Sequence, residues 1–124
     1  MIRGLGCDLC EVCRMEENLQ NERFLARFFT EGERAYINAR GVMRAQTTAG
    51  MFAAKEAFVK ALGTGFGALS VQDVEITHDE SGAPSYVMSE KLRQALLARG
   101  AKTAFLSISH DGGFAMATAV LEGE

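Results

Sequence analysis

The segment that most restricts the fold is "FAAKEAFVKALGTG", from Phe52 to Gly65. Nine of the twelve residues from Met51 to Leu62 are apolar. A helix that is apolar on all sides is normally buried, so we expect a central helix here that "GTGFG" ends. Yet Lys55, Glu56 and Lys60 lie within it, and a buried charge is costly unless a partner, metal or ligand compensates it. These charges therefore need partners within the protein or a bound group.

The N-terminal half predicts one strand and two helices before this segment. Ile2 to Leu9 alternates as a strand, with Asp8 on a face that otherwise carries two glycines and lets backbone or a ligand approach. A helix is predicted from Glu11 to about Gln20, and "RFLARFF" extends its apolar pattern. A second helix begins at Thr30, where "TEGE" has the spacing of a capping box, and ends at Gly41.

The C-terminal half predicts four strands and one helix. "DESGAP" and "DGG" are turn signals between pairs of alternating runs, and Ser89 is a helix cap. The result is an α+β fold with a small, mainly antiparallel sheet packed against helices. We expect residues 1–124 to form one domain. The predicted elements are strands Ser70 to Thr77, Ser85 to Met88, Ala104 to His110 and Phe114 to Glu122, and a helix ending at Arg99.

Composition and charge exclude several classes of protein. The formal net charge of −3 argues against non-specific nucleic-acid binding. The stretch from Arg34 to Arg44 holds three arginines and no acid; it is read as a solvated face or, alternatively, as a contact for an anionic partner. The sequence contains no apolar run long enough to span a bilayer and begins without a signal-peptide pattern. We therefore expect a cytoplasmic protein.

Three cysteines stand together in "CDLCEVC", at Cys7, Cys10 and Cys13. Their spacing is similar to that of iron–sulfur ligands, but the chain has no fourth cysteine. We interpret them as small buried side chains in a reducing compartment.

A set of polar residues at separate places in the sequence suggests phosphoryl-type chemistry. Glu56 and Lys60 are four residues apart, so a simple salt bridge along the helix is one interpretation. Asp8 is a second carboxylate, and "SISH" puts Ser109 and His110 at a strand end beside a glycine turn. Two carboxylates, a lysine, a glycine segment and a histidine are typical of Mg²⁺-assisted transfer. We therefore expect a metal ion and a phosphate to compensate the charges of the central helix. "GTGFG" alone is weak support, because it follows a helix whereas a phosphate-binding Walker loop precedes one.

Over nearly its whole length the sequence resembles the holo-[acyl-carrier-protein] synthases, small 4′-phosphopantetheinyl transferases of fatty-acid synthesis. The most specific match is the segment described first. The others occur in the family's order: "GLGCDLCEVCR", "RFLARFFTEGE", "VQDVEI", "GAP" and "SISH".

The resemblance implies a definite reaction. These enzymes move the 4′-phosphopantetheine arm of coenzyme A onto a serine of apo acyl carrier protein and release adenosine 3′,5′-bisphosphate. They use Mg²⁺, with Mn²⁺ as the alternative metal. They form homotrimers whose active sites lie between subunits. The implied partners are therefore coenzyme A, apo acyl carrier protein and further copies of this chain.

The resemblance also implies roles for single residues. Asp8 and Glu56 fall on the family's magnesium ligands, and Lys60 on the lysine that assists the leaving phosphate; these three are the predicted catalytic residues. The predicted coenzyme A contacts are Arg44, Lys60, Gly63, Gly65, Ser109 and His110.

The sequence departs from the family pattern at Cys7, Cys10 and Cys13, where the family uses other small or apolar residues, and at Met51. Where the family often has arginine, in "GRFAAKEA", this sequence has "GMFAAKEA" with Met51. A basic contact to coenzyme A is therefore lost or supplied from elsewhere, and Arg44 is the residue we expect to supply it.

The acceptor is expected to dock through local positive charge, because acyl carrier proteins are acidic around their modified serine. Arg14 follows the Asp8 strand, and Arg23 and Arg27 are four apart on one predicted helical face. Acidic residues lie between them, so ordinary surface arginines remain the alternative; docking on Arg34, Arg40 and Arg44 is a further one.

Two other functions remain open from sequence. One is a non-catalytic coenzyme A or acyl-chain binding module with a decayed site. The other is a cysteine-based redox or iron–sulfur carrier.

Overall fold

The computed structural model describes residues 1–124 and has four α-helices before the second strand. The elements are β1 (Ile2–Glu11), α1 (Val12–Asn18), α2 (Arg23–Phe28), α3 (Glu31–Asn38), the 3₁₀ helix η1 (Gly41–Met43), α4 (Arg44–Leu62), β2 (Ile76–His78), β3 (Pro84–Tyr86), α5 (Glu90–Ala98), β4 (Thr103–Asp111) and β5 (Phe114–Glu122).

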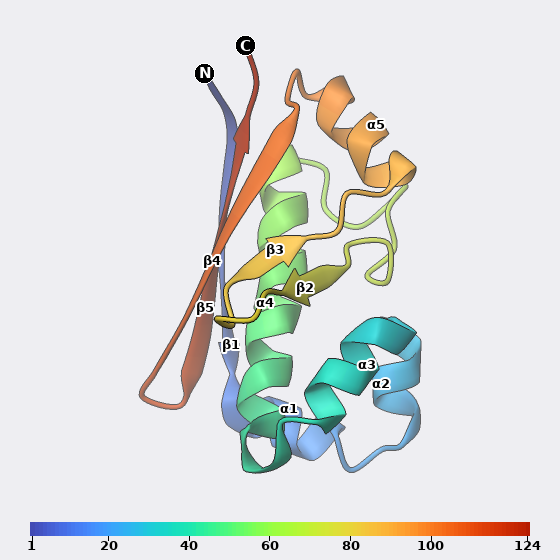
Figure 1. Cartoon of the computed structure of the whole chain (residues 1–124), viewed down its shortest axis with the longest axis vertical. Helices are drawn as coiled ribbons and strands as arrows, with labels where there is room; N and C mark the ends of the chain where they lie inside the picture. Colours follow the sequence, from blue (N-terminus) through green and yellow to red (C-terminus); the bar gives the residue numbers. More distant parts are fainter.

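The long helix α4 is the centre of the molecule (Figure 1). An antiparallel sheet with strand order β1–β5–β4 packs on one side of it. The short antiparallel hairpin β2–β3 and helix α5 lie on the other side, and α1 to α3 gather around its N-terminal end (Figure 1). The predicted α+β class with a mainly antiparallel sheet is confirmed.

The face of β1 that carries glycine packs directly on the backbone of α4. A Cβ atom added at Gly6 would overlap the carbonyl oxygen of Ala57, and one added at Gly4 would overlap that of Ala61. On the partner strand β5, Ala119 lies opposite Gly6 and Ala117 opposite Asp8, both fully buried, so the helix approaches the sheet closely there. The bare face predicted from sequence is thus filled at both glycines by helix backbone, and a ligand has room only beyond them, toward Asp8.

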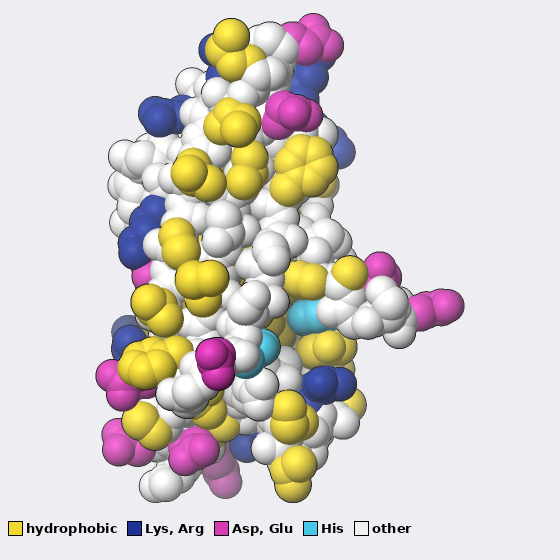
Figure 2. All heavy atoms as spheres, turned by 90° about the vertical axis from the view of Figure 1, so that its left-hand side faces the viewer, with side chains coloured by type: hydrophobic (Ala, Val, Ile, Leu, Met, Phe, Trp, Pro, Cys, Tyr) yellow, Lys and Arg dark blue, Asp and Glu magenta, His cyan; other side chains and the backbone are white.

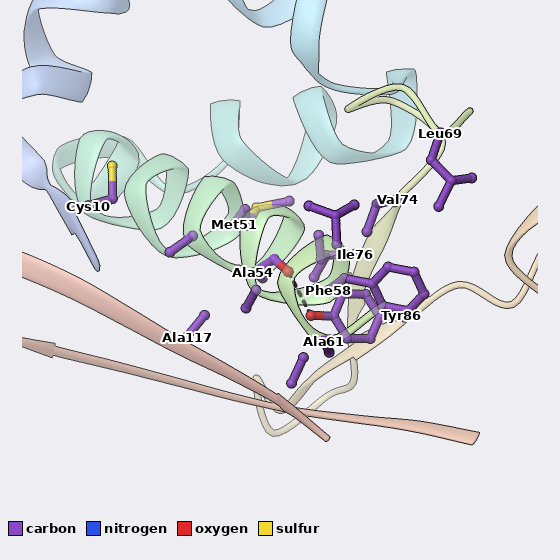
Figure 3. Packing of buried hydrophobic residues seen from close by; sticks show 14 of the residues in the cluster. Cys10, Met51, Ala54, Phe58, Ala61, Leu69, Val74, Ile76, Tyr86 and Ala117 are labelled. Carbon is purple, nitrogen blue, oxygen red and sulfur yellow. Dashed lines mark hydrogen bonds between the residues drawn. The ribbon is translucent and has the colours of Figure 1, made fainter. Parts of the chain in front are cut away.

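The other side of α4 packs against larger side chains (Figure 3). The rings of Phe58 and Tyr86 lie 4.9 Å apart between centroids. The Tyr86 hydroxyl donates a hydrogen bond of 2.6 Å to the carbonyl oxygen of Ala54 and is thereby satisfied inside the core. This bond ties the β2–β3 hairpin to the central helix.

The locally encoded caps and turns are confirmed. Thr30 and Glu33 form the reciprocal capping box of α3, and the Ser89 side chain accepts from the backbone N–H of Leu92 at the start of α5. Gly112 and Gly113 both have positive φ in the two-residue turn between β4 and β5, as a hairpin of this kind requires.

Several predicted boundaries were wrong. The helix predicted from Glu11 to about Gln20 ends at Asn18, and "RFLARFF" forms the separate helix α2 instead of extending it. Helix α4 begins at Arg44 rather than Met51, and Gly41 begins η1 instead of ending α3, which stops at Asn38. The predicted strand from Ser70 to Thr77 is confined to Ile76–His78 at its end. The residues before it form turns in which the Asp73 carboxylate accepts from the backbone N–H of Ser70.

None of the helices combines the length and the apolar character needed to cross a bilayer.

Candidate active site

Asp8 and Lys60 meet at the edge of the β1–α4 contact. Lys60 Nζ lies 2.7 Å from Asp8 Oδ1 and also donates to the carbonyl oxygen of Cys7 at 3.2 Å. The lysine side chain is 53% exposed and the aspartate 18%. The hydrogen bond to Asp8 raises the pKa of Lys60 above its usual value. The pair is thus charged, accessible and attached to two rigid elements.

Glu56 lies one helical turn before Lys60 and is half-buried. It makes no hydrogen bond and no ion pair, so the predicted alternative of a Glu56–Lys60 salt bridge is not formed. Burial raises the pKa of Glu56, and repulsion from Asp8 raises it further, whereas Lys60 and Arg14 act in the opposite direction. A carboxylate without a partner beside a second carboxylate is suited to binding a cation.

Lys55 has a different role from its two charged neighbours. Its ammonium is fully buried and lies 2.9 Å from Glu33 Oε1, and it donates to the carbonyl oxygens of Val71 and Val74 at 2.9 and 2.8 Å. All three of its donors are therefore used inside the protein. The expectation that metal and phosphate compensate the charges of this helix was wrong for Lys55.

Arg14 lies next to the carboxylates. Its guanidinium is 5.7 Å from the centroid of the Phe52 ring, one turn before Glu56, and its charge opposes the rise in the pKa of Glu56. Phe52 contacts Phe28 edge-on at 6.4 Å, and Arg27 stacks over Phe28 at 5.2 Å. Two of the three arginines predicted for docking therefore flank one aromatic pair beside the site, whereas Arg23 is exposed on α2 outside that pair.

The other predicted contacts lie apart from this group. His110 Nε2 is 3.0 Å from the carbonyl oxygen of Gln46, near the start of α4. Lys60 follows Gln46 by fourteen residues, which is about 21 Å along a helix. Gly63 and Gly65 come after its end. In one chain, therefore, His110 lies beside the N-terminal half of α4, whereas Lys60 lies in the C-terminal half.

Ser109 and His110 also diverge. His110 pairs in register with buried Ala115 and faces α4, whereas Ser109 pairs with exposed Met116 on the outer face of the sheet. Arg44 donates through Nε to Asn38 Oδ1 at 3.0 Å. Its groove is lined by α1 and the start of α4 and does not include His110.

The cysteines do not share a site. Cys10 is buried in the core, as expected, but Cys7 and Cys13 are exposed, which corrects the expectation for those two. No three side chains of the metal-binding types come together anywhere in the chain.

Sequence reasoning missed Tyr36 and His78 beside His110, and it named Arg40 only as an alternative docking contact. Tyr36, Arg40 and His78 line one cavity with it, together with Gly82 and Pro84 of "GAP". That motif was a signal for the cavity, since it lies in the turn that follows His78.

The protein itself offers two carboxylates to a metal ion, one of them with a free oxygen and one without any partner. This set of hard oxygen donors fits Mg²⁺, which commonly takes one or two carboxylates and completes its shell with water and phosphate oxygens.

Residues 4–119 match the family described as the 4′-phosphopantetheinyl transferase superfamily. The chain is similar to a holo-[acyl-carrier-protein] synthase of Treponema denticola, with 38% identity over 99% of this chain and 100% of that one.

Two crystal structures are similar in fold. The holo-[acyl-carrier-protein] synthase of Neisseria meningitidis has a TM-score of 0.87 and 34% identity, over 98% of this chain and 99% of that one. The enzyme of Bacillus anthracis, in complex with CoA (3′,5′-ADP), has a TM-score of 0.82 and 38% identity, over 100% and 99%.

Proposed function

The chain belongs to the 4′-phosphopantetheinyl transferase superfamily, and from this premise we propose that it is a holo-[acyl-carrier-protein] synthase acting as one domain. It transfers 4′-phosphopantetheine from coenzyme A to a serine of apo acyl carrier protein and releases adenosine 3′,5′-bisphosphate, which activates the carrier for fatty-acid biosynthesis. The observation that carries the proposal is the meeting of Asp8, Glu56 and Lys60 within a chain that matches such enzymes over its full length. These intact side chains speak against a decayed, non-catalytic binding module.

Asp8 and Glu56 are proposed to hold Mg²⁺ or Mn²⁺ together. When bound, the ion would polarise a phosphoryl oxygen and neutralise charge on the phosphates. The support is chemical: Glu56 has no partner, and Asp8 uses only one oxygen for Lys60.

Lys60 is proposed to stabilise the leaving group. The serine hydroxyl loses its proton to solvent as its oxygen forms a bond to phosphorus, the bond from phosphorus to the departing phosphate of adenosine 3′,5′-bisphosphate breaks, and negative charge grows on that phosphate. Lys60 has a spare N–H donor facing solvent, because its ammonium bonds only Asp8 and the Cys7 carbonyl. Asp8 fixes the position of this donor before the reaction begins.

The carrier protein is proposed to dock over Arg14 and Arg27. Each guanidinium lies over one ring of the Phe28–Phe52 pair, so their positive charge is presented near Glu56. Arg23 is proposed to extend this surface along α2. An acidic carrier docked here would bring its serine to the carboxylates.

We also propose that the chain works as a homotrimer in the cytoplasm. The outer face of the β1–β5–β4 sheet exposes large apolar side chains (Figure 2), more than a monomer usually leaves in water. This outer apolar face lies on all three strands and comprises Leu5, Leu9, Phe105, Phe114 and Met116. A second copy is the occupant that also explains why His110 and Lys60 lie far apart in one chain. Three free cysteines agree with a reducing compartment.

The direct test is the mass of apo acyl carrier protein before and after incubation with coenzyme A, Mg²⁺ and this protein. We expect the mass of the phosphopantetheine arm to appear on the carrier only when all three are present. A carrier of unchanged mass, despite measurable coenzyme A binding, would mean a binding module and reject the enzyme.

Subunit mixing tests the shared site. Lys60→Ala and His110→Ala are each expected to be poorly active alone. If one site takes Lys60 from one copy and His110 from another, mixed oligomers regain activity because some sites are intact. No recovery after unfolding and refolding the two variants together would place each site within one chain.

A further inference from the structure

The two histidines of the chain line the same cavity. It measures about 210 Å³ and lies where α3, α4, the β2–β3 turn and β4 meet. His78 comes from the end of β2 and His110 from β4, and the remaining polar lining comes from Tyr36, Arg40 and Thr47. The sequence contains only these two histidines, so both imidazoles of the protein face one small space.

Arg40 is the one permanent charge among the residues lining this cavity. Its guanidinium lies over the Tyr36 ring at 5.6 Å, and its Nε contacts Thr47 Oγ1 at 3.4 Å. It forms no ion pair, and the lining includes no aspartate or glutamate. The guanidinium is therefore held in place with most of its N–H donors free, which is the state in which arginine recognises a phosphate.

His78 continues the same stack. Its ring lies parallel to Tyr36 at 3.9 Å with an angle of 1° between the planes. Its Nδ1 is buried and has no hydrogen-bond partner, an arrangement that is costly unless a ligand completes it. The neighbouring Asp79 does not fill this role, because its carboxylate accepts from the backbone of Ser81 and Ala83 in its own turn.

His110 closes the opposite wall. It approaches α4 closely because residue 50 is glycine: a Cβ there would lie 2.9 Å from His110 Nε2. Met51 follows and lines the cavity as well. The site thus has one fixed cation, two imidazole rings and no acid. This fits a phosphomonoester, a dianion that itself exchanges a proton near neutral pH.

We propose that Arg40 is the specificity-determining residue for the 3′-phosphate of coenzyme A, with His78 and His110 beside it. The inference rests on the proposed function. Met51, where the family often has arginine, carries no charge, and Arg40 supplies a cation to the cavity that Met51 also lines. Arg44, the residue expected from sequence to replace that contact, bonds Asn38 and does not line the cavity. Arg40 therefore discriminates coenzyme A from its 3′-dephospho form.

The experiment compares coenzyme A with 3′-dephospho-coenzyme A as donors for the wild-type protein and Arg40→Gln. Loss of a charge-assisted bond should reduce the preference in kcat/KM for coenzyme A by about tenfold to a hundredfold, with little change for the dephospho form. Arg93→Gln, an exposed arginine on α5, is the matched control. His78→Phe keeps a flat ring against Tyr36 and should reduce the preference less.

Several results would overturn the inference. These are an equal loss for both donors in Arg40→Gln, a loss of preference in Arg44→Gln instead, or a change confined to the KM for carrier protein. An unchanged preference in His78→Phe would remove that residue from the site and reject the arrangement proposed.

Calorimetry separates this inference from the proposed function, because it needs no turnover. Wild-type protein should bind adenosine 3′,5′-bisphosphate more tightly than adenosine 5′-monophosphate, and Arg40→Gln should lose most of this difference. Transfer to the carrier without this difference in binding rejects the role of Arg40 only. The difference in binding without any transfer rejects the enzyme and leaves the phosphate site.

Discussion

Two lysines on α4, five residues apart, show how burial decides what the same side chain does. Lys55 and Lys60 each contact a carboxylate, at 2.9 and 2.7 Å. Both members of the Lys55–Glu33 pair are fully buried, whereas Lys60 and Asp8 are 53% and 18% exposed. Lys55 uses all its donors within the protein; Lys60 keeps one for a ligand. A buried lysine whose donors are all used stabilises the fold, whereas an exposed lysine with a free donor can contact a substrate.

The largest expected effect is a loss of turnover when either carboxylate near Lys60 is removed. Glu56→Ala removes the carboxylate that has no partner, and Asp8→Ala removes the other proposed metal ligand. Both variants should remain folded and lose metal-dependent turnover, measured as holo-carrier formation over a range of Mg²⁺ concentrations. If either keeps full activity with the same Mg²⁺ dependence, it is not a metal ligand. A loss of stability alone would make these carboxylates structural, like Glu33.

On the buried side, Lys55→Met should lower the free energy of unfolding by about 3–5 kcal/mol, the usual cost of removing one member of a buried ion pair. Glu33 would be left as an uncompensated buried charge, and the carbonyl oxygens of Val71 and Val74 would each lose one hydrogen bond. Urea unfolding measures the change. The matched control, Lys60→Met, should cost less than about 1 kcal/mol because its pair is exposed. Similar losses in the two variants would contradict the comparison.

In activity the order of the two lysines should reverse. Lys60→Ala is expected to lower kcat by about 10² or more, as loss of one preorganised donor to a developing charge does. The KM for coenzyme A should change less, because the charge grows only in the transition state. Steady-state kinetics on apo carrier protein gives both constants. A change confined to KM would make Lys60 a binding residue.

Whether the sequence predicts a structural feature depends on how far apart in the chain the residues that determine it lie. The Thr30 capping box and the turn at Gly112 and Gly113 need only neighbouring residues, and both were predicted correctly. The role of Lys55 depends on Glu33, twenty-two residues away, so the helix pattern alone could not separate it from Lys60.

The wrong strand has the same cause. Val74 and Ile76 alternate with polar neighbours like strand residues, but residues 71–73 form a turn, and the carbonyl oxygens of Val71 and Val74 accept from Lys55 Nζ. The glycines of β1 are a further case. Sequence predicts a bare face there, but only the packed structure reveals that α4 backbone fills it at Gly4 and Gly6.

A smaller effect is expected for the exposed charge next to the site. Arg14→Ala should raise the KM for carrier protein about twofold to fivefold, flatten its dependence on salt and leave the KM for coenzyme A unchanged, because rim charges act mainly on association. Arg23→Ala/Arg27→Ala is the companion variant on α2. If both leave the carrier KM and its salt slope unchanged, docking lies elsewhere, with Arg34, Arg40 and Arg44 as the next surface to test.

The smallest effect should come from His78, a half-buried group between the extremes of Lys55 and Lys60. Burial, followed by the charge of Arg40, lowers the pKa of His78, while Asp79 opposes the shift. The unfolded chain therefore takes up a proton near the ordinary histidine value, about 6.5, before the folded protein does. Protonation then favours unfolding, so this contribution is complete above that pH and is lost as the pH falls toward the lower pKa of the folded state.

His78→Phe keeps the stack on Tyr36 but cannot titrate. Its free energy of unfolding, measured in urea at pH 7.5, 6.5 and 5.5, should fall less steeply than that of the wild type, by less than about 1.4 kcal/mol per pH unit. Parallel curves would show that burial at this depth does not control the charge of His78.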